Sequence, residues 1–246
     1  MKKFNALVGY TGFIGSNLKK KFKFNKFFNT KNIKKIKNFN YRFIICSGTY
    51  SKIWLANKKP QKDLKNIKNL IKNLETVHTD FIVLISTIEV YGKNNNKNEK
   101  KNIYKYKNCN AYSVNRIILE KFIKKEFKNY LIIRLPIVYG NGFVKNCIFD
   151  LLNNNEIKKL NGEDLVQIYN VENLAEHIKI AIRKKLKVVN ISPQPIKLSY
   201  IAKKNFNLKI NNYKNPRKMK MKTIYKKFKI SKEKTLSELK SFCERY

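Results

Sequence analysis

Tyr112 and Arg116 are the first residues whose types and spacing could do chemistry. They lie four apart in a segment, 111–128, with helical periodicity, so a helix would place phenol and cation on one face. A nearby cation favours the ionised phenol, which suits Tyr112 to acid/base work at neutral pH. Thr87 follows an apolar strand, 81–86, and its hydroxyl could bind the same substrate oxygen. Taken alone, a Tyr-x-x-x-Arg pair is more often structural than catalytic.

Three glycines follow the first apolar segment, 4–8, and could build a phosphate site. Gly9 permits a sharp turn, Gly12 lets a backbone amide approach a pyrophosphate, and Gly15 lets the next helix pack closely on the strand. The N-terminus of that helix would favour an anion. The alternative is a tight connection that binds nothing.

The ends of the next two expected strands bear on the choice of cofactor. An acid at the end of the second strand, 26–29, would hold the ribose hydroxyls of NAD, but Asn29, Thr30 and Lys31 stand there. This favours NADP over NAD. The third strand, 41–46, runs into Ser47 and Gly48, which are small enough for a cofactor to approach closely.

Strand and helix patterns alternate along most of the chain, which predicts an α/β fold with a doubly wound parallel (Rossmann-like) sheet and a small C-terminal substrate lobe. Residues 1–140 are expected to form the dinucleotide-binding domain. Residues 141–246 are expected to combine the remaining sheet elements with a reduced substrate-binding lobe. Thr235 and Glu238 have capping-box spacing and predict the start of a last helix. Further strands are expected at 130–135 and 188–191, and further helices at 16–24, 61–77, 144–153, 171–184 and 198–205.

Composition excludes some classes of protein. No apolar run is long enough to span a membrane, and the scattered cysteines and the separate His78 and His177 predict a cytoplasmic protein without a metal site. The formal charge of +39 would suit nucleic acid, but Lys is spread over the whole chain instead of being concentrated. A genome-wide bias toward Lys, Asn, Ile, Phe and Tyr explains this composition, so nucleic-acid binding is not the favoured interpretation.

Together these motifs resemble those of the extended short-chain dehydrogenase/reductases, the NAD-dependent epimerase/dehydratase family, and they occur in the family's order over nearly the whole chain. The matching segments are the glycine turn at 9–15, Thr87-x-x-Val90-Tyr91-Gly92, Tyr112-x-x-x-Arg116, Arg134-Leu135-Pro136-Ile137-Val138-Tyr139-Gly140 and the stretch at 168–175. The resemblance implies that Tyr112 exchanges a proton with a sugar hydroxyl while the nicotinamide exchanges hydride, with Thr87 sharing the hydrogen bond. Arg116 would bind the nicotinamide ribose and lower the phenol pKa. The residues expected to bind the cofactor are Gly9, Thr11, Gly12, Phe13, Ile14, Gly15, Asn29, Thr30, Lys31, Ser47, Gly48, Tyr112 and Arg116.

Glu89 occupies the position of a Glu that acts as a base in the family's sugar-nucleotide dehydratases, although a structural role is at least as well supported. Three features depart from the family. Arg116 replaces the family's lysine and cannot pass a proton, Ile137 replaces a frequent Asn near the substrate diphosphate, and the chain is short after Gly140.

The sequence therefore predicts an NAD- or NADP-dependent epimerase, ketoreductase or dehydratase that acts on a nucleotide-diphosphate sugar and uses Tyr112 as acid/base. One alternative is a non-catalytic sensor or partner protein that binds a dinucleotide with the same fold. The other is a nucleic-acid-binding protein, which charge alone supports. The resemblance also implies a homodimer formed through helices that include 111–128.

Overall fold

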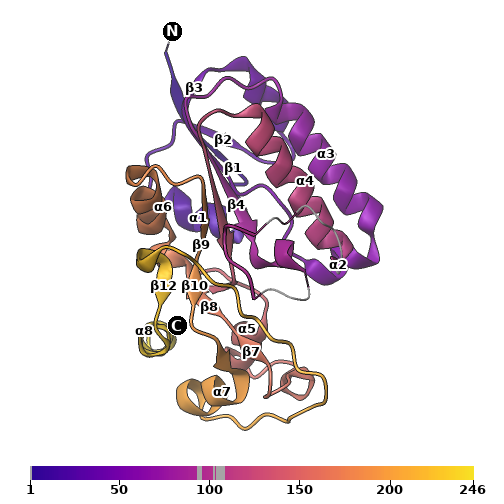
Figure 1. Cartoon of the computed structure of the whole chain (residues 1–246), viewed down its shortest axis with the longest axis vertical. Coiled ribbons are helices and arrows are strands. Elements are labelled where there is room, and N and C mark those ends of the chain that lie inside the picture. Colours follow the sequence, from indigo (N-terminus) through magenta and orange to yellow (C-terminus); the bar gives the residue numbers. More distant parts are fainter. Residues whose placement is uncertain (1, 93–95, 102, 104–108) are drawn as a thin grey trace.

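Six parallel strands form one sheet in the order β2-β1-β3-β4-β5-β9, in a computed structural model that describes residues 2–92, 96–101, 103 and 109–246 (Figure 1). The central strands lack polar alternation because helices cover both faces of the sheet. This confirms the predicted doubly wound α/β fold. The strands are β1 (Phe4–Val8), β2 (Lys26–Phe28), β3 (Tyr41–Cys46), β4 (Ile82–Thr87), β5 (Tyr130–Leu135) and β9 (Val188–Asn190).

Helices pack on both faces of this sheet. On one face α3 (Pro60–Leu74), α4 (Ala111–Glu126) and the 3-10 helix η1 (Ile33–Asn38) pack with the strands in one hydrophobic cluster. On the other face α1 (Phe13–Lys19) and α6 (Leu174–Arg183) pack in a second cluster. In Figure 1, α3 and α4 accordingly lie on one side of the strands and α1 and α6 on the other.

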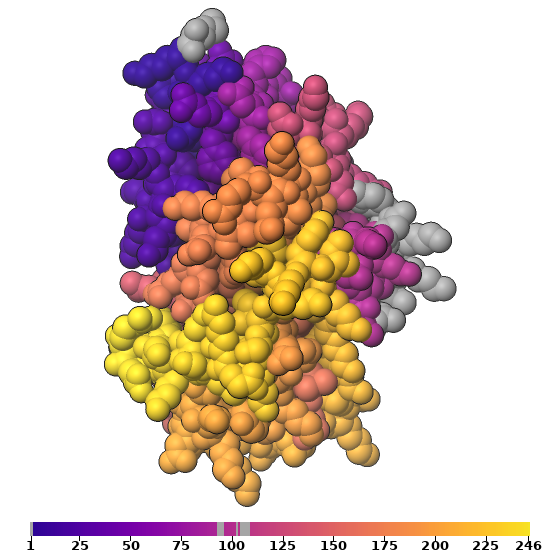
Figure 2. All heavy atoms as spheres, turned by 60° about the vertical axis from the view of Figure 1, so that its left-hand side comes forward, coloured from indigo at the N-terminus to yellow at the C-terminus, as the bar shows by residue number. Residues whose placement is uncertain are grey.

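The rest of the chain forms a lobe at the end of the sheet that is lower in Figure 1, with its own core around Tyr139, Ile201 and Leu239. Figure 2 shows the C-terminal residues, in yellow, lying across the middle of the visible face beside orange residues. Strand β9 and helix α6, both after residue 140, pack with the main sheet. The division of the chain at residue 140 stays a prediction. The lobe contains β6 (Ile137–Tyr139), α5 (Cys147–Leu152), β7 (Leu165–Val166), β8 (Ile168–Asn170), β10 (Ser192–Pro193), β11 (Ile196–Lys197), α7 (Leu198–Phe206), β12 (Lys229–Ile230) and α8 (Lys232–Cys243).

Short elements connect these units, and several of them, including the helix α2 (Ile53–Lys58), are absent from the sequence-based prediction. This helix precedes α3, and its short apolar pattern is too brief to be recognised. The 3-10 helices are η2 (Ile88–Tyr91), η3 (Ile157–Lys159), η4 (Val171–Asn173) and η5 (Lys226–Phe228). None of the described helices combines the length and apolar character that a membrane crossing requires.

Three predicted helix starts are wrong, and capping explains each. Helix α1 begins at Phe13, because Gly12 is already its N-cap and accepts a hydrogen bond from the Ser16 amide at 2.8 Å. Helix α8 begins at Lys232, because the Ser231 hydroxyl, and not Thr235, caps it. Helix α5 begins only at Cys147, because Asn146 has a φ of 114° and caps it with its side chain.

His177 lies on α6 between two aromatic rings, and its protonation is expected to destabilise the fold. Its Nδ1 is hydrogen-bonded to the Tyr169 hydroxyl at 2.6 Å, and its ring packs 5.5 Å from that of Phe228. Burial, followed by repulsion from Lys234, lowers the pKa of His177 to about 4.

This lowered pKa makes stability depend on pH. Below the ordinary pKa of about 6.5, the unfolded chain binds a proton that the folded chain does not, so the free energy of unfolding falls as the pH drops toward 4. At pH 5 the expected loss is about 1–2 kcal/mol, and His177→Gln should remove it. Urea unfolding at pH 7 and pH 5 measures this, with His78→Gln, an exposed position, as control. Equal pH dependence in wild type and His177→Gln would contradict the assignment.

Candidate cofactor and active site

The glycine turn between β1 and α1 contains two glycines that the fold requires and one that leaves space. Gly9 has a φ of +83°, and a Cβ there would lie 2.6 Å from the Ser47 carbonyl oxygen. A Cβ on Gly15 would lie 2.1 Å from the Gly9 oxygen. At Gly12 the nearest atom to a Cβ, the same oxygen, is 3.4 Å away. The outer side of Gly12 is therefore open to a ligand.

A pocket of about 180 Å³ adjoins this turn at the carboxyl ends of β1, β2 and β3. It brings together about half of the residues expected at the cofactor. The expected residues that do not line it are Phe13, Ile14, Gly15, Lys31, Tyr112 and Arg116. Phe13 packs against Phe143 instead, with ring centroids 6.3 Å apart. Tyr50, Asn66 and Asn69 line the pocket and were not expected from the sequence. The expected residues that line it are Gly9, Thr11, Gly12, Asn29, Thr30, Ser47 and Gly48.

Asn29 occupies the end of β2 without offering a carboxylate. Its Oδ1 accepts a hydrogen bond from the Lys31 amide at 2.9 Å, and its Nδ2 lies 3.4 Å from the Tyr10 hydroxyl. No acidic residue lines the pocket among the described residues. A phosphate on the adenosine ribose would therefore meet no negative side chain here.

Tyr112 lies in the first turn of α4 and Thr87 at the end of β4, and this helix and this strand contact each other. The Asn110 side chain caps α4 by accepting from the Ser113 amide at 2.9 Å. The Tyr112 amide donates to Asn57 Oδ1 at 3.1 Å, and its side chain is only 6% exposed. Thr87 Oγ1 accepts from the Glu89 amide at 3.2 Å, which fixes the turn after β4.

Arg116 forms a buried bidentate ion pair with Asp63, which the sequence did not predict. Its Nη1 and Nη2 donate to the two carboxylate oxygens of Asp63 at 2.8 and 3.1 Å, and Nη2 also donates to the Tyr50 carbonyl at 2.6 Å. Its Nε is buried and has no partner among the described residues. The guanidinium carbon lies 4.1 Å from the centroid of the Tyr112 ring. Both terminal nitrogens are thus already engaged, whereas the resemblance implied a cation that binds ribose.

The pKa of Tyr112 is raised above its ordinary value, whereas the cation four residues away predicts a lowered one. Burial is the largest cause, and the nearby Arg116 opposes it, while the carboxylates of Glu89 and Asp63 raise the pKa further. In the ligand-free protein Tyr112 therefore holds its proton at neutral pH.

Glu89 forms an ion pair with Arg217, a residue of the C-terminal lobe. The Glu89 side chain is 14% exposed, and the Arg217 amide also donates to Asp164 at 2.7 Å. This pair connects the first turn of η2 with the lobe. It engages the carboxylate that a dehydratase would use as a base.

A buried polar network fixes α4 against the sheet. Arg134 donates to Glu120 through Nε at 3.0 Å and Nη2 at 2.6 Å, and through Nη1 to the Tyr91 hydroxyl at 2.7 Å. Ser86 Oγ also donates to Glu120 at 2.6 Å, and Asn190 Nδ2 donates to Tyr91 at 2.8 Å. The network joins β4, η2, α4, β5 and β9. Arg134 and Tyr91 belong to motifs recognised in the sequence, but Glu120 carries no motif that would reveal it.

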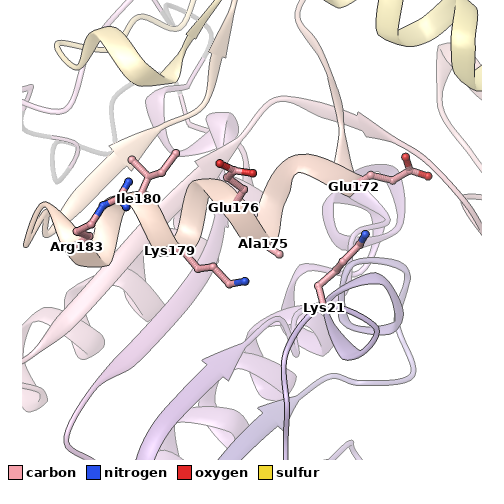
Figure 3. A pocket seen from close by; sticks show the side chains of 7 residues that line it. All are labelled: Lys21, Glu172, Ala175, Glu176, Lys179, Ile180 and Arg183. Atoms are coloured by element: carbon pink, nitrogen blue, oxygen red, sulfur yellow. The ribbon is translucent and has the colours of Figure 1, made fainter.

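A second hollow of about 400 Å³ lies at the surface between α6 and the segment after α1 (Figure 3). It contains none of the residues expected at the cofactor or the reacting atoms, although Glu172 and Ala175 belong to the family-like stretch at 168–175. Its side chains carry both signs of charge and are mostly exposed, so it offers no ordered set of catalytic groups. The lining residues are Lys21, Glu172, Ala175, Glu176, Lys179, Ile180 and Arg183.

Comparison with known proteins agrees with this arrangement. A model of the NAD dependent epimerase/dehydratase family matches residues 29–192. The structure is similar to dTDP-4-dehydrorhamnose reductase from Yersinia enterocolitica, with a TM-score of 0.77, 17% identity and coverage of 99% of both chains. The same reductase from Bacillus anthracis, in complex with NADP, gives a TM-score of 0.76 and 18% identity over 100% of this chain and 99% of that one. UDP-glucose 4-epimerase from Thermotoga maritima, with UDP-glucose, gives a TM-score of 0.72 and 17% identity. That match covers 98% of this chain and 97% of the epimerase chain. Among curated proteins none matches the sequence.

Proposed function

The chain belongs to the NAD dependent epimerase/dehydratase family, and we propose that it binds NAD or NADP beside the glycine turn and acts on a nucleotide-activated sugar. One observation carries the proposal. The pocket extends from Gly12 to Tyr50, and the Tyr50 carbonyl is held by Arg116, which packs on Tyr112. A dinucleotide in this pocket would therefore have its reactive end close to Tyr112.

The residues present fit such a cofactor. The turn at Gly12 has room for a pyrophosphate, Asn29 and Thr30 would border the adenosine ribose, and Ser47 and Gly48 would lie along the middle of the molecule. The cofactor would supply hydride transfer, and the protein would supply position and a proton. No acidic residue lines the pocket beside Asn29 in the part of the chain that the structure describes, which supports NADP over NAD.

Tyr112 is proposed as the acid/base and Thr87 as the second hydrogen-bonding group on the substrate oxygen. Solved neighbours contain UDP-glucose and UDP-N-acetylmuramic acid, and a nucleotide-diphosphate sugar is the corresponding proposal for this chain. The lobe around Arg217 is proposed to hold it. A homodimer through α4 stays a prediction.

The non-catalytic alternative has one specific observation in its favour. Arg116 replaces the family's lysine and is paired with Asp63, so it resembles a structural residue as much as a cofactor ligand. Incubation with each reduced or oxidised cofactor and a panel of keto and hydroxy sugar nucleotides, followed through the nicotinamide absorbance and product analysis, distinguishes the two. Turnover of one substrate class is expected. Cofactor binding without turnover of any member would instead support the sensor or partner role.

A further inference from the structure

We propose that Asn141 is a site of spontaneous covalent modification, at which the side-chain amide becomes a carboxylate, and that this change loosens the contact between the lobe and helix α1. The chain has two Asn-Gly pairs, Asn141-Gly142 and Asn161-Gly162. This dipeptide favours the reaction because glycine places no side chain beside its attacking amide nitrogen. The structure exposes one pair and protects the other. The proposal does not depend on cofactor binding or on turnover.

Asn141 and Gly142 are the two central residues of an exposed turn. The Phe143 amide donates to the Gly140 carbonyl at 3.2 Å, and Gly142 has a φ of +84°, as in a type II turn. A Cβ on Gly142 would meet no atom within 4 Å apart from its chain neighbours. Among the described residues, neither the Asn141 side chain nor the Gly142 amide has a hydrogen-bond partner. The attacking and the attacked group are therefore both free to move.

The reaction needs only these two residues and water. The Gly142 nitrogen loses its proton and forms a bond to the side-chain carbonyl carbon of Asn141. The bond from that carbon to Nδ2 breaks, and Nδ2 takes up a proton and leaves as ammonia. Water then opens the resulting cyclic imide. Attack on its side-chain carbonyl gives aspartate, and attack on its main-chain carbonyl gives isoaspartate, in which the chain runs through the former side chain.

Asn161-Gly162 has the same chemistry, but the fold holds both residues in place. Asn161 Nδ2 donates to the Tyr213 carbonyl at 3.1 Å, and Oδ1 accepts from the amides of Tyr213 and Glu163 at 2.9 and 3.1 Å. Gly162 is buried, and its amide donates to the Asn211 carbonyl at 2.7 Å. Attack at this pair would first have to break these hydrogen bonds. The second pair is therefore a control within the same molecule.

The turn at Asn141 is also a contact between the lobe and helix α1. Asn17 Nδ2 in α1 donates to the Asn141 carbonyl at 3.0 Å, and Phe13 packs on Phe143 with ring centroids 6.3 Å apart. In isoaspartate this carbonyl becomes a free carboxylate outside the main chain, and the main chain gains one carbon before Gly142. The spacing between the two contacts changes, so we expect weaker packing on α1 and a lower Tm.

Incubation of the folded protein at pH 8, followed by digestion and chromatography with mass spectrometry, tests the site. The method separates the asparagine, aspartate and isoaspartate forms of each peptide. We expect conversion at Asn141 to be at least about tenfold faster than at Asn161, because several hydrogen bonds must be lost at Asn161. In urea, where the fold no longer distinguishes them, both pairs should react at comparable rates.

Conversion in the folded protein that is no faster at Asn141 than at Asn161 would overturn the assignment of the site. Asn141→Ser, which lacks the amide but keeps the main-chain carbonyl, tests the effect on α1. After the same incubation the wild type should have a lower Tm than before, and Asn141→Ser should keep its own Tm. A wild type that converts at Asn141 without a decrease in Tm, or an equal decrease in Asn141→Ser, would overturn that effect.

Discussion

Replacing Tyr112 with Phe is expected to lower kcat by a factor of about 10²–10⁴, the usual contribution of a positioned acid/base. The phenol is the group that we place closest to the reacting oxygen, and Phe retains the ring. Because the Arg116 guanidinium lies over the ring face, packing and burial should survive the change. KM and cofactor affinity should therefore change little.

Tyr139→Phe is the matched control for this substitution. Tyr139 is fully buried, and its hydroxyl has no hydrogen-bond partner among the described residues. Removing that hydroxyl should leave kcat unchanged. Steady-state rates and thermal unfolding of both variants, measured together, separate chemistry from stability. Wild-type turnover in folded Tyr112→Phe would remove Tyr112 from the mechanism.

Replacing Glu120 with Ala is expected to destabilise the fold by about 3–5 kcal/mol, because it leaves the buried Arg134 charge without its partner. Glu120 is 0% and Arg134 1% exposed, and two hydrogen bonds join them. Ser86 would lose its acceptor as well. Denaturant unfolding, with a lower midpoint at unchanged slope, measures the effect.

Two further variants make this test specific to the buried pair. Glu126→Ala removes a partly exposed carboxylate from the same helix and should change stability by less than about 0.5 kcal/mol. Glu120→Met with Arg134→Met replaces both charges by apolar side chains and should recover much of the loss. If Glu120→Ala were no more harmful than Glu126→Ala, the network would not be what holds α4 on the sheet.

The parts of the fold that depend on local patterns could be predicted from the sequence. The strands β3 and β5 have the predicted bounds, because their apolar runs are buried on both faces and end at polar or Pro residues. The turn at Gly9 and Gly15 was recognisable, since only glycine tolerates the backbone contacts found there. The spacing of Tyr112 and Arg116 likewise predicts that the two side chains lie on the same face of one helix.

Interactions between distant segments could not be predicted. Asp63 precedes Arg116 by 53 residues, and Glu89 precedes Arg217 by 128. In a chain so rich in Lys, nothing in composition indicates which carboxylate pairs with which cation. Yet these pairs set the charge around Tyr112, and the carboxylates of Glu89 and Asp63 add to the effect of burial, which is the largest cause of its raised pKa. Two capping residues also compete locally, because both Ser231 and Thr235 could begin the last helix, and in the structure the Ser231 side chain caps it.

Binding of NAD, NADH, NADP and NADPH, measured as a thermal shift, tests the central claim most directly. A ligand that binds only the folded state adds about 2.7 kcal/mol at a concentration 100 times its Kd. Gly12→Val is the informative variant, since the backbone there is extended and tolerates a Cβ, while the isopropyl group would fill the space proposed for the pyrophosphate. Lys179→Val places the same group in the hollow of Figure 3 as control.

We predict that one cofactor pair, NADP and NADPH, raises the Tm of wild type and of Lys179→Val, and that Gly12→Val folds but shows no shift. Absence of a shift with all four dinucleotides in the folded wild-type protein would contradict a dinucleotide site. It would favour the interpretation of the chain as a nucleic-acid-binding protein.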